Sequence, residues 1–148
     1  MRVRVLFVTT ALLAGAVPAS AAENEVDPSI ADGSAQRALD SARARWREHG
    51  PRNYRYRVRL GCFCTPDALE PRNFVVRGGK PRHPPKGWKY ASTAPRLLKL
   101  VQEAIDDRPQ HLFVRYRKNG LLKELSVDRS EMIADEEYSY FVDRFSSP

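Results

Sequence analysis

The sequence contains few of the residues that usually signal catalysis or metal binding. It has only two cysteines and three histidines in 148 residues. The histidines (His49, His83 and His111) are far apart and fall on different expected elements, so no four-ligand zinc site is indicated. No serine has a neighbouring histidine, and no hydrolase, kinase or dinucleotide motif is present. The sequence therefore predicts no catalytic residue, no metal and no cofactor, and it does not indicate an enzyme.

Long apolar runs are also absent, except near the N-terminus. Two arginines precede an uncharged, mostly apolar stretch over residues 5–17, and Ala19-Ser20-Ala21 follows as a small-x-small motif. This order is typical of a secretory signal peptide over residues 1–22, cleaved near Ala21 or Ala22. The stretch is shorter than the about 20 apolar residues that span a bilayer. The sequence thus predicts a periplasmic or extracellular protein without a transmembrane segment, in a compartment where disulfides persist.

Basic residues outnumber acidic residues, and they are unevenly distributed. The formal net charge is +7, and removal of the two signal-peptide arginines leaves +5. Residues 43–96 contain 14 basic and 3 acidic residues, whereas residues 121–148 contain 3 basic and 7 acidic residues. A basic exported protein suits an acidic envelope protein or an anionic polymer as partner. Nucleic acid is not an expected partner, because export separates the protein from cellular nucleic acid and the sequence contains no nucleic-acid recognition motif.

Periodicity predicts one α+β domain over residues 34–146, preceded by a polar flexible leader over residues 23–33. Helical spacing favours a helix from Ser34, taken as its N-cap, to Gly50-Pro51, and a second helix capped by Thr93. Period-two alternation favours strands over residues 54–64, 73–77, 111–117 and 121–128, and a last strand from Tyr138 to near Phe145, with Asn119-Gly120 closing a hairpin. We expect a two-layer sandwich in which two helices pack on one face of an antiparallel sheet of about five strands.

Residues 80–87 carry three prolines, three lysine or arginine side chains and one histidine. Proline has no backbone N–H to donate to a neighbouring strand, so this segment cannot be a central strand, and we expect a cationic surface loop. His83, Trp88 and Tyr90, in and beside this loop, are candidate contact residues for a partner. Of the aromatic residues, Trp88 and Tyr90 are expected to be the better exposed pair.

Cys62 and Cys64 are the only two cysteines in the chain. In a straight strand their Cα atoms would be about 6.6 Å apart, and a disulfide usually joins Cα atoms about 5.5–6 Å apart. A bridge therefore requires a bend, which Gly61 and Pro66 allow. A structural disulfide is the favoured interpretation for an exported chain. Packed thiols, a two-thiolate copper(I) site and redox chemistry remain the alternatives.

Arg55, Arg57 and Arg59 share one face of the first strand. They are a possible binding face for an anionic partner. The alternative is that they pair across the sheet with Glu136, Glu137 or Asp143, and we favour it because charge runs are usually solvated or paired.

Four short motifs recur in the order of a known family: Ala44-Arg45-Trp46, Tyr54-Arg55-Tyr56, Cys62-Phe63-Cys64 and Glu137-Tyr138-Ser139-Tyr140. With them the chain resembles, over about residues 38–145, small exported bacterial proteins of domain-of-unknown-function family 6174. The resemblance implies an exported small domain and brings no activity with it. Pro81, Pro84 and Pro85 depart from the family pattern, in which an apolar strand follows the glycine turn.

Together these observations favour a non-enzymatic binding or inhibitor-like module, which uses the basic sheet face or the 80–90 segment to hold its partner. The alternative is a redox or copper(I)-handling protein that works through Cys62 and Cys64.

Overall fold

The computed structural model describes residues 25–148 except 131 and 134, so the predicted signal peptide lies outside the described residues. The elements follow in the order α1 (Pro28–Ala31), α2 (Ser34–His49), β1 (Tyr54–Cys62), α3 (Pro66–Leu69), β2 (Arg72–Arg77), β3 (Lys80–Arg82), the 3-10 helix η1 (Lys89–Ala91), α4 (Ala94–Asp106), β4 (His111–Tyr116), β5 (Leu122–Asp128) and β6 (Tyr138–Ser146).

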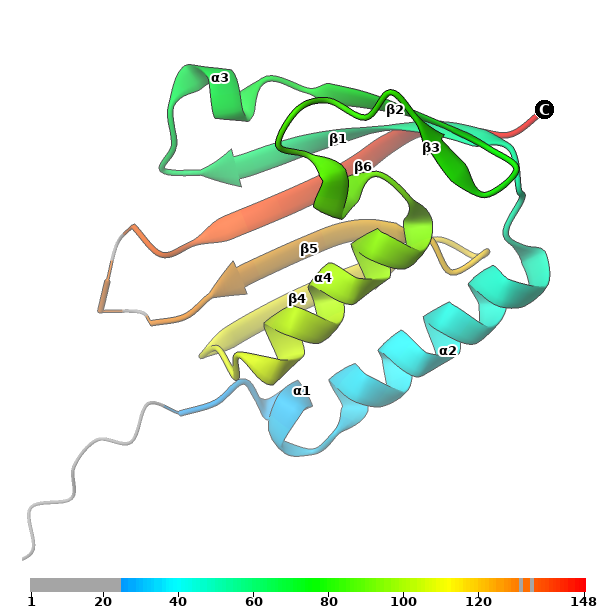
Figure 1. Ribbon diagram of the computed structural model, residues 1–148. Coiled ribbons are helices and arrows are strands. Elements are labelled where there is room, and N and C mark those ends of the chain that lie inside the picture. Colours follow the sequence, from blue (N-terminus) through cyan, green and yellow to red (C-terminus); the bar gives the residue numbers. More distant parts are fainter. Residues whose placement is uncertain (1–24, 131, 134) are drawn as a thin grey trace, which may run out of the picture.

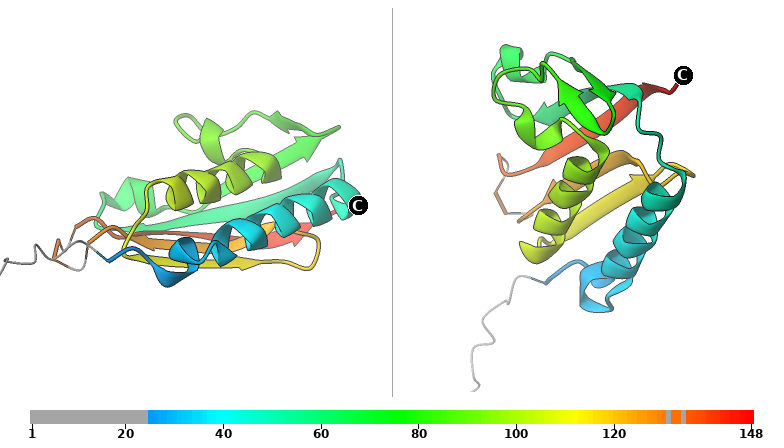
Figure 2. Two further views of the ribbon diagram at one scale, coloured as in Figure 1. Left: turned by 90° about the horizontal axis from the view of Figure 1, so that it is seen from below. Right: turned by 45° about the vertical axis from the view of Figure 1, so that its right-hand side comes forward.

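The strands form one antiparallel sheet in the order β3-β2-β1-β6-β5-β4. Helices α2 and α4 lie on the same side of it (Figure 1). In the right-hand view of Figure 2, α2 and α4 again lie on one face of the sheet, in front of the strands. The predicted α+β two-layer sandwich is confirmed, with six strands rather than about five.

The core lies between the two layers. Leu39 and Ala42 of α2 and the apolar face of α4 are fully or almost fully buried against the inward-facing side chains of the sheet. On α4 this face comprises Ala94, Leu97, Leu98, Val101, Ala104 and Ile105. The spacing of these residues matches the helical period, which explains why this segment forms a helix that packs on one side.

The β4–β5 hairpin is confirmed, and its turn packs directly on α2. Gly120 has a φ of 87°, and a Cβ at this position would lie 2.1 Å from the carbonyl oxygen of Ala42. Only glycine fits both the backbone conformation and the available space.

Three segments differ from the sequence predictions. Residues 27–33 are not a flexible leader, because Asp27 is buried, accepts a 2.8 Å hydrogen bond from the backbone N–H of Leu112, and caps α1. Gly33 rather than Ser34 is the N-cap of α2. Residues 80–82 form the edge strand β3, which tolerates Pro81 because an edge strand leaves one side without ladder partners.

Candidate functional site

Two tyrosines of β1 hold the segment that carries a cationic hollow of the described chain. Tyr54 and Tyr56 point toward the helices and are buried. The Tyr56 hydroxyl donates a 2.5 Å hydrogen bond to the carbonyl of Ala91, and the Tyr54 hydroxyl accepts a 3.0 Å bond from the N–H of Ala94. These two bonds fix the junction between η1 and α4 to the middle of the sheet.

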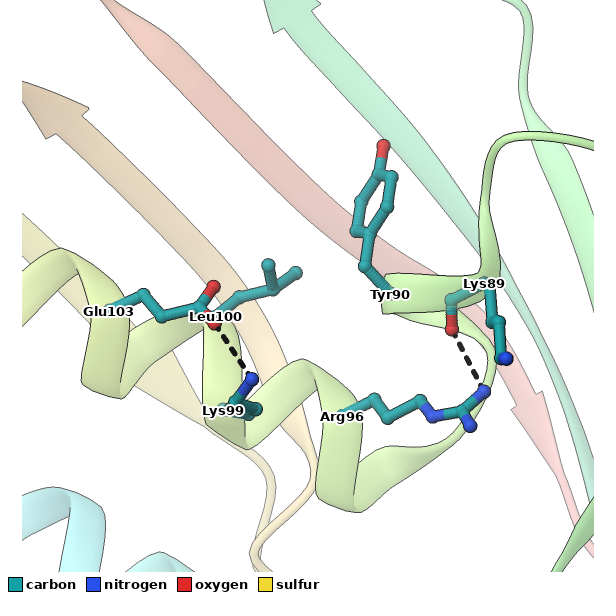
Figure 3. Close-up of a pocket in the computed structure, with 6 residues that line it drawn as sticks. All are labelled: Lys89, Tyr90, Arg96, Lys99, Leu100 and Glu103. Carbon is teal, nitrogen blue, oxygen red and sulfur yellow. Dashed lines mark hydrogen bonds and ion pairs between the residues drawn. The ribbon is translucent and has the colours of Figure 1, made fainter.

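The site itself is a hollow of about 430 Å³ between η1 and α4, which we call the cationic pocket. It is lined by Lys89, Tyr90, Arg96, Lys99, Leu100 and Glu103. Figure 3 shows these side chains along one side of α4 and on η1, with Leu100 and Tyr90 rising from the two elements and Arg96 reaching back toward Lys89. The lining therefore combines three cations and one carboxylate with Tyr90 and Leu100.

Arg96 is held in place by the backbone around it. Its Nη1 donates to the carbonyl of Lys89 at 3.0 Å and to the Ser92 hydroxyl at 2.6 Å. A guanidinium has five N–H donors, so these bonds leave donors for a ligand. Lys99 forms an ion pair with Glu103 at 3.2 Å. Glu103 is the one carboxylate in a lining that contains three cations, so the pocket keeps a positive excess.

Tyr90 is the one aromatic residue that lines the pocket, and other rings hold it from behind. Tyr90 stacks on Trp88 with ring centroids 5.7 Å apart and meets Tyr140 of β6 edge-on at 6.2 Å. Burial, followed by interaction with Tyr90, raises the pKa of Tyr140 well above its usual value. The hydroxyl of Tyr140 is therefore neutral at every physiological pH, and Tyr90 packs against uncharged rings.

The three loop residues predicted as contacts differ in exposure and in their position relative to the pocket. Tyr90 is 38% exposed and lines the pocket. Trp88 is only 8% exposed, so the prediction that it is an exposed partner of Tyr90 is wrong. Its indole is needed to fill the space between Phe74 and Tyr90. His83 is exposed directly after β3 and does not line the pocket.

The arginines of β1 are largely paired across the sheet. Arg57 forms a bidentate interaction with Asp143 of β6, with Nε and Nη2 at 2.7 and 2.9 Å from the two carboxylate oxygens. Arg59 reaches the same carboxylate at 3.2 Å. The hydrogen bond from Arg57 lowers the pKa of Asp143 despite partial burial. The pairing interpretation is confirmed for Asp143, whereas Arg55 has no ion pair among the described residues.

Cys62 and Cys64 are joined by a disulfide, with Cα atoms 5.2 Å apart. Strand β1 ends at Cys62 and the backbone bends at Phe63, as the sequence geometry required. Phe63 is 84% exposed, and Cys64 is also exposed. The disulfide borders a second, smaller hollow of about 340 Å³ that includes Tyr138, the residue opposite Cys62 in the sheet. The bridge is therefore accessible to solvent.

Other kinds of site are not found in the described part of the chain. Residues 25–148, with 131 and 134 excepted, contain no group of three or more histidine, cysteine, aspartate or glutamate side chains arranged to hold a metal ion. Within the same residues, no helix has the length and apolar character needed to cross a membrane.

Sequence reasoning missed most of the cationic pocket. It did not single out Arg96, Lys99 or Leu100, because they lie outside the apolar face of α4. One signal was present: Leu100 lies beside the apolar face of α4, four positions after Arg96 and three before Glu103, which is the spacing of side chains that meet.

The fold and its site define a small α+β domain with a cationic pocket on the helical side of its sheet. Comparison with known proteins identifies the family: residues 38–147 match the model of a family of unknown function, DUF6174, and the chain belongs to this family. No curated protein and no solved structure matches the chain.

Proposed function

We propose that this protein is an exported, non-enzymatic binding module that holds an anionic group of its partner in the cationic pocket. The observation that carries the proposal is the arrangement of Lys89, Arg96 and Lys99 around the apolar surface of Tyr90 and Leu100, with Glu103 as the one acidic side chain. An acidic envelope protein or an anionic polymer fits this chemistry.

Two features support binding rather than a solvated helix surface. Arg96 is already fixed by Lys89 and Ser92, so little rotamer entropy is lost when it binds a carboxylate or phosphate. In addition, Tyr54 and Tyr56 tie the junction between η1 and α4 to the sheet, which fixes the relative position of the two elements that carry the cations. Preorganised charge-assisted hydrogen bonds are the strong ones in recognition.

The test uses fluorescently labelled poly-L-glutamate as a carboxylate probe and measures anisotropy with the chain from residue 23 onward. Each hydrogen bond to a charged group contributes about 1.5–3 kcal/mol, so Arg96→Ala with Lys99→Ala should weaken binding about tenfold or more. The matched control, Arg37→Ala with Arg108→Ala, removes the same charge from exposed positions outside the pocket. Equal weakening by both pairs would show that net charge, not the pocket, holds the probe.

A second candidate function is favoured by the exposed disulfide. The Cys62–Cys64 bridge closes a loop with a sequence separation of two, which contributes only about 1.6 kcal/mol of chain-entropy stabilisation. A disulfide that contributes so little to the stability of the fold is compatible with a redox role, or with copper(I) binding after reduction. Titration with dithiothreitol followed by alkylation and intact-mass analysis would support this role if reduction occurs near physiological potentials and one copper(I) then binds. Resistance to reduction would rule it out.

A further inference from the structure

The charged residues of this protein are separated along the direction of its strands. At one end of the sheet lie the start of β1, the β2–β3 hairpin, the β4–β5 turn and the end of β6. We call this the basic end and define it as residues 50–55, 77–82, 117–123 and 144–148. It contains nine cations and no aspartate or glutamate: Arg52, Arg55, Arg77, Lys80, Arg82, Arg117, Lys118, Lys123 and Arg144.

The opposite end of the sheet is acidic. Among the described residues of segments 62–72, 106–111 and 128–138, eight carboxylates stand against three arginines. The carboxylates are Asp67, Glu70, Asp106, Asp107, Asp128, Asp135, Glu136 and Glu137. The protein therefore carries an electric dipole that turns the basic end toward any strongly anionic body.

The cations of the basic end are not neutralised within the protein. None of the nine forms an ion pair with a carboxylate among the described residues, in contrast to Arg57 and Arg59. On the open face of the sheet, Arg77 stands directly opposite Lys80, and Val75 is flanked by Arg55 on β1 and Arg82 on β3. Like charges at opposed positions destabilise a sheet, so an external anion would relieve a repulsion that the fold itself leaves in place.

The shape of the basic end indicates which anion this is. Its residues extend across all six strands, a width of about 24 Å at the usual strand spacing. Figure 1 shows these strand ends and turns side by side on the right of the molecule. A single polymer chain would follow one line of charges, whereas a planar surface can meet cations of several strand ends at once. The tip of the β2–β3 hairpin is formed by Gly78 and Gly79, with open space around both, so it allows close approach.

From this charge complementarity and breadth we propose that the basic end docks on the anionic phospholipid headgroups of a membrane surface. Arginine is suited to this, because its guanidinium binds phosphate in a bidentate manner. The exposed side chain of Val75, 38% accessible, lies among the arginines and would contact the headgroup region. This site is separate from the cationic pocket, which lies between η1 and α4.

The test is co-sedimentation of the chain from residue 23 onward with vesicles of phosphatidylglycerol and phosphatidylcholine, compared with vesicles of phosphatidylcholine alone. We expect binding to the anionic vesicles only, and loss of binding at high salt. The variant Arg77→Gln/Lys80→Gln/Arg82→Gln should weaken the partition coefficient about a hundredfold, since each cation near such a surface contributes about fivefold.

The matched control is Arg37→Gln/Arg108→Gln/Arg129→Gln, which removes three exposed cations outside the basic end. It should change vesicle binding only a few-fold. Equal weakening by the two triple variants, or no binding to anionic vesicles at low salt, would overturn the proposal. Soluble polyphosphate that binds as tightly as the vesicles would also overturn it, in favour of a polymer ligand. Arg96→Ala/Lys99→Ala should bind vesicles normally, so this test and that of the cationic pocket can fail separately.

Discussion

The hydroxyl of Tyr56 should be the most important single polar group for holding the cationic pocket in place. Tyr56→Phe removes the 2.5 Å hydrogen bond to Ala91 and keeps the ring, which stacks on Tyr54 and Phe74 with centroids 5.8 and 5.2 Å away. Because Ala91 is fully buried, its carbonyl loses this donor with no access to water. An unsatisfied buried acceptor costs about 1–3 kcal/mol.

Tyr116→Phe is a matched control from the same protein. The Tyr116 hydroxyl is also buried, but it has no hydrogen-bond partner among the described residues. Its removal should leave the free energy of unfolding unchanged or slightly increased, because no bond is lost and a desolvated polar group disappears. The two substitutions are chemically identical, so their difference isolates the hydrogen bond to Ala91.

The assay is urea unfolding followed by tryptophan fluorescence and circular dichroism. We expect Tyr56→Phe to lower the free energy of unfolding by about 1–3 kcal/mol, which is a fall in melting temperature of about 4–12 °C for a domain of this size. We expect a change near zero for Tyr116→Phe. Equal effects of the two variants, or a change below about 0.3 kcal/mol for Tyr56→Phe, would refute the role given to this bond.

Two further predictions concern acid stability and the β4–β5 turn. The folded-state pKa of Asp143 is lowered by Arg57, so its stabilising contribution is present above the unfolded-state pKa of about 3.9 and is lost as the pH falls through the folded-state value. Wild type should therefore be more stable than Asp143→Asn at pH 7, and the difference should shrink as the pH falls below about 3.9 in urea titrations; a constant difference would contradict this. Gly120→Ala should destabilise far more than Gly79→Ala, because both have positive φ but only Gly120 meets the carbonyl of Ala42. Equal melting temperatures of the two variants would show that backbone strain at positive φ, and not the contact with Ala42, causes the loss of stability.

Much of the fold is readable from the sequence because local patterns and tertiary packing agree. The alternation from Tyr54 to Cys62 requires one buried face, and the sheet supplies it. Asn119-Gly120 predicts the hairpin because glycine provides the positive φ that the turn needs. The disulfide also follows from local geometry, since the required bend is available at Phe63.

The parts that sequence reasoning missed depend on partners distant in the chain. The short helix α1 is ordered because Asp27 meets the N–H of Leu112, 85 positions away. Trp88 is buried because Phe74 of β2 lies beneath it, although its neighbours are prolines and lysines. The cationic pocket combines η1 with α4, and the junction between them is set by two hydroxyls of β1. Tyr54 and Tyr56 lie outside residues 80–100, so the hydrophobic pattern of that segment does not indicate these bonds.

Amide NMR shift mapping can show directly whether the cationic pocket binds an anionic group. Hexaglutamate would be titrated into the isotope-labelled chain at low salt, with neutral hexaglutamine as control. We expect saturable shifts concentrated on Lys89, Tyr90, Arg96, Lys99 and Leu100, and no response to the neutral peptide. Shifts spread evenly over all exposed basic residues, or absent from these five, would contradict this expectation.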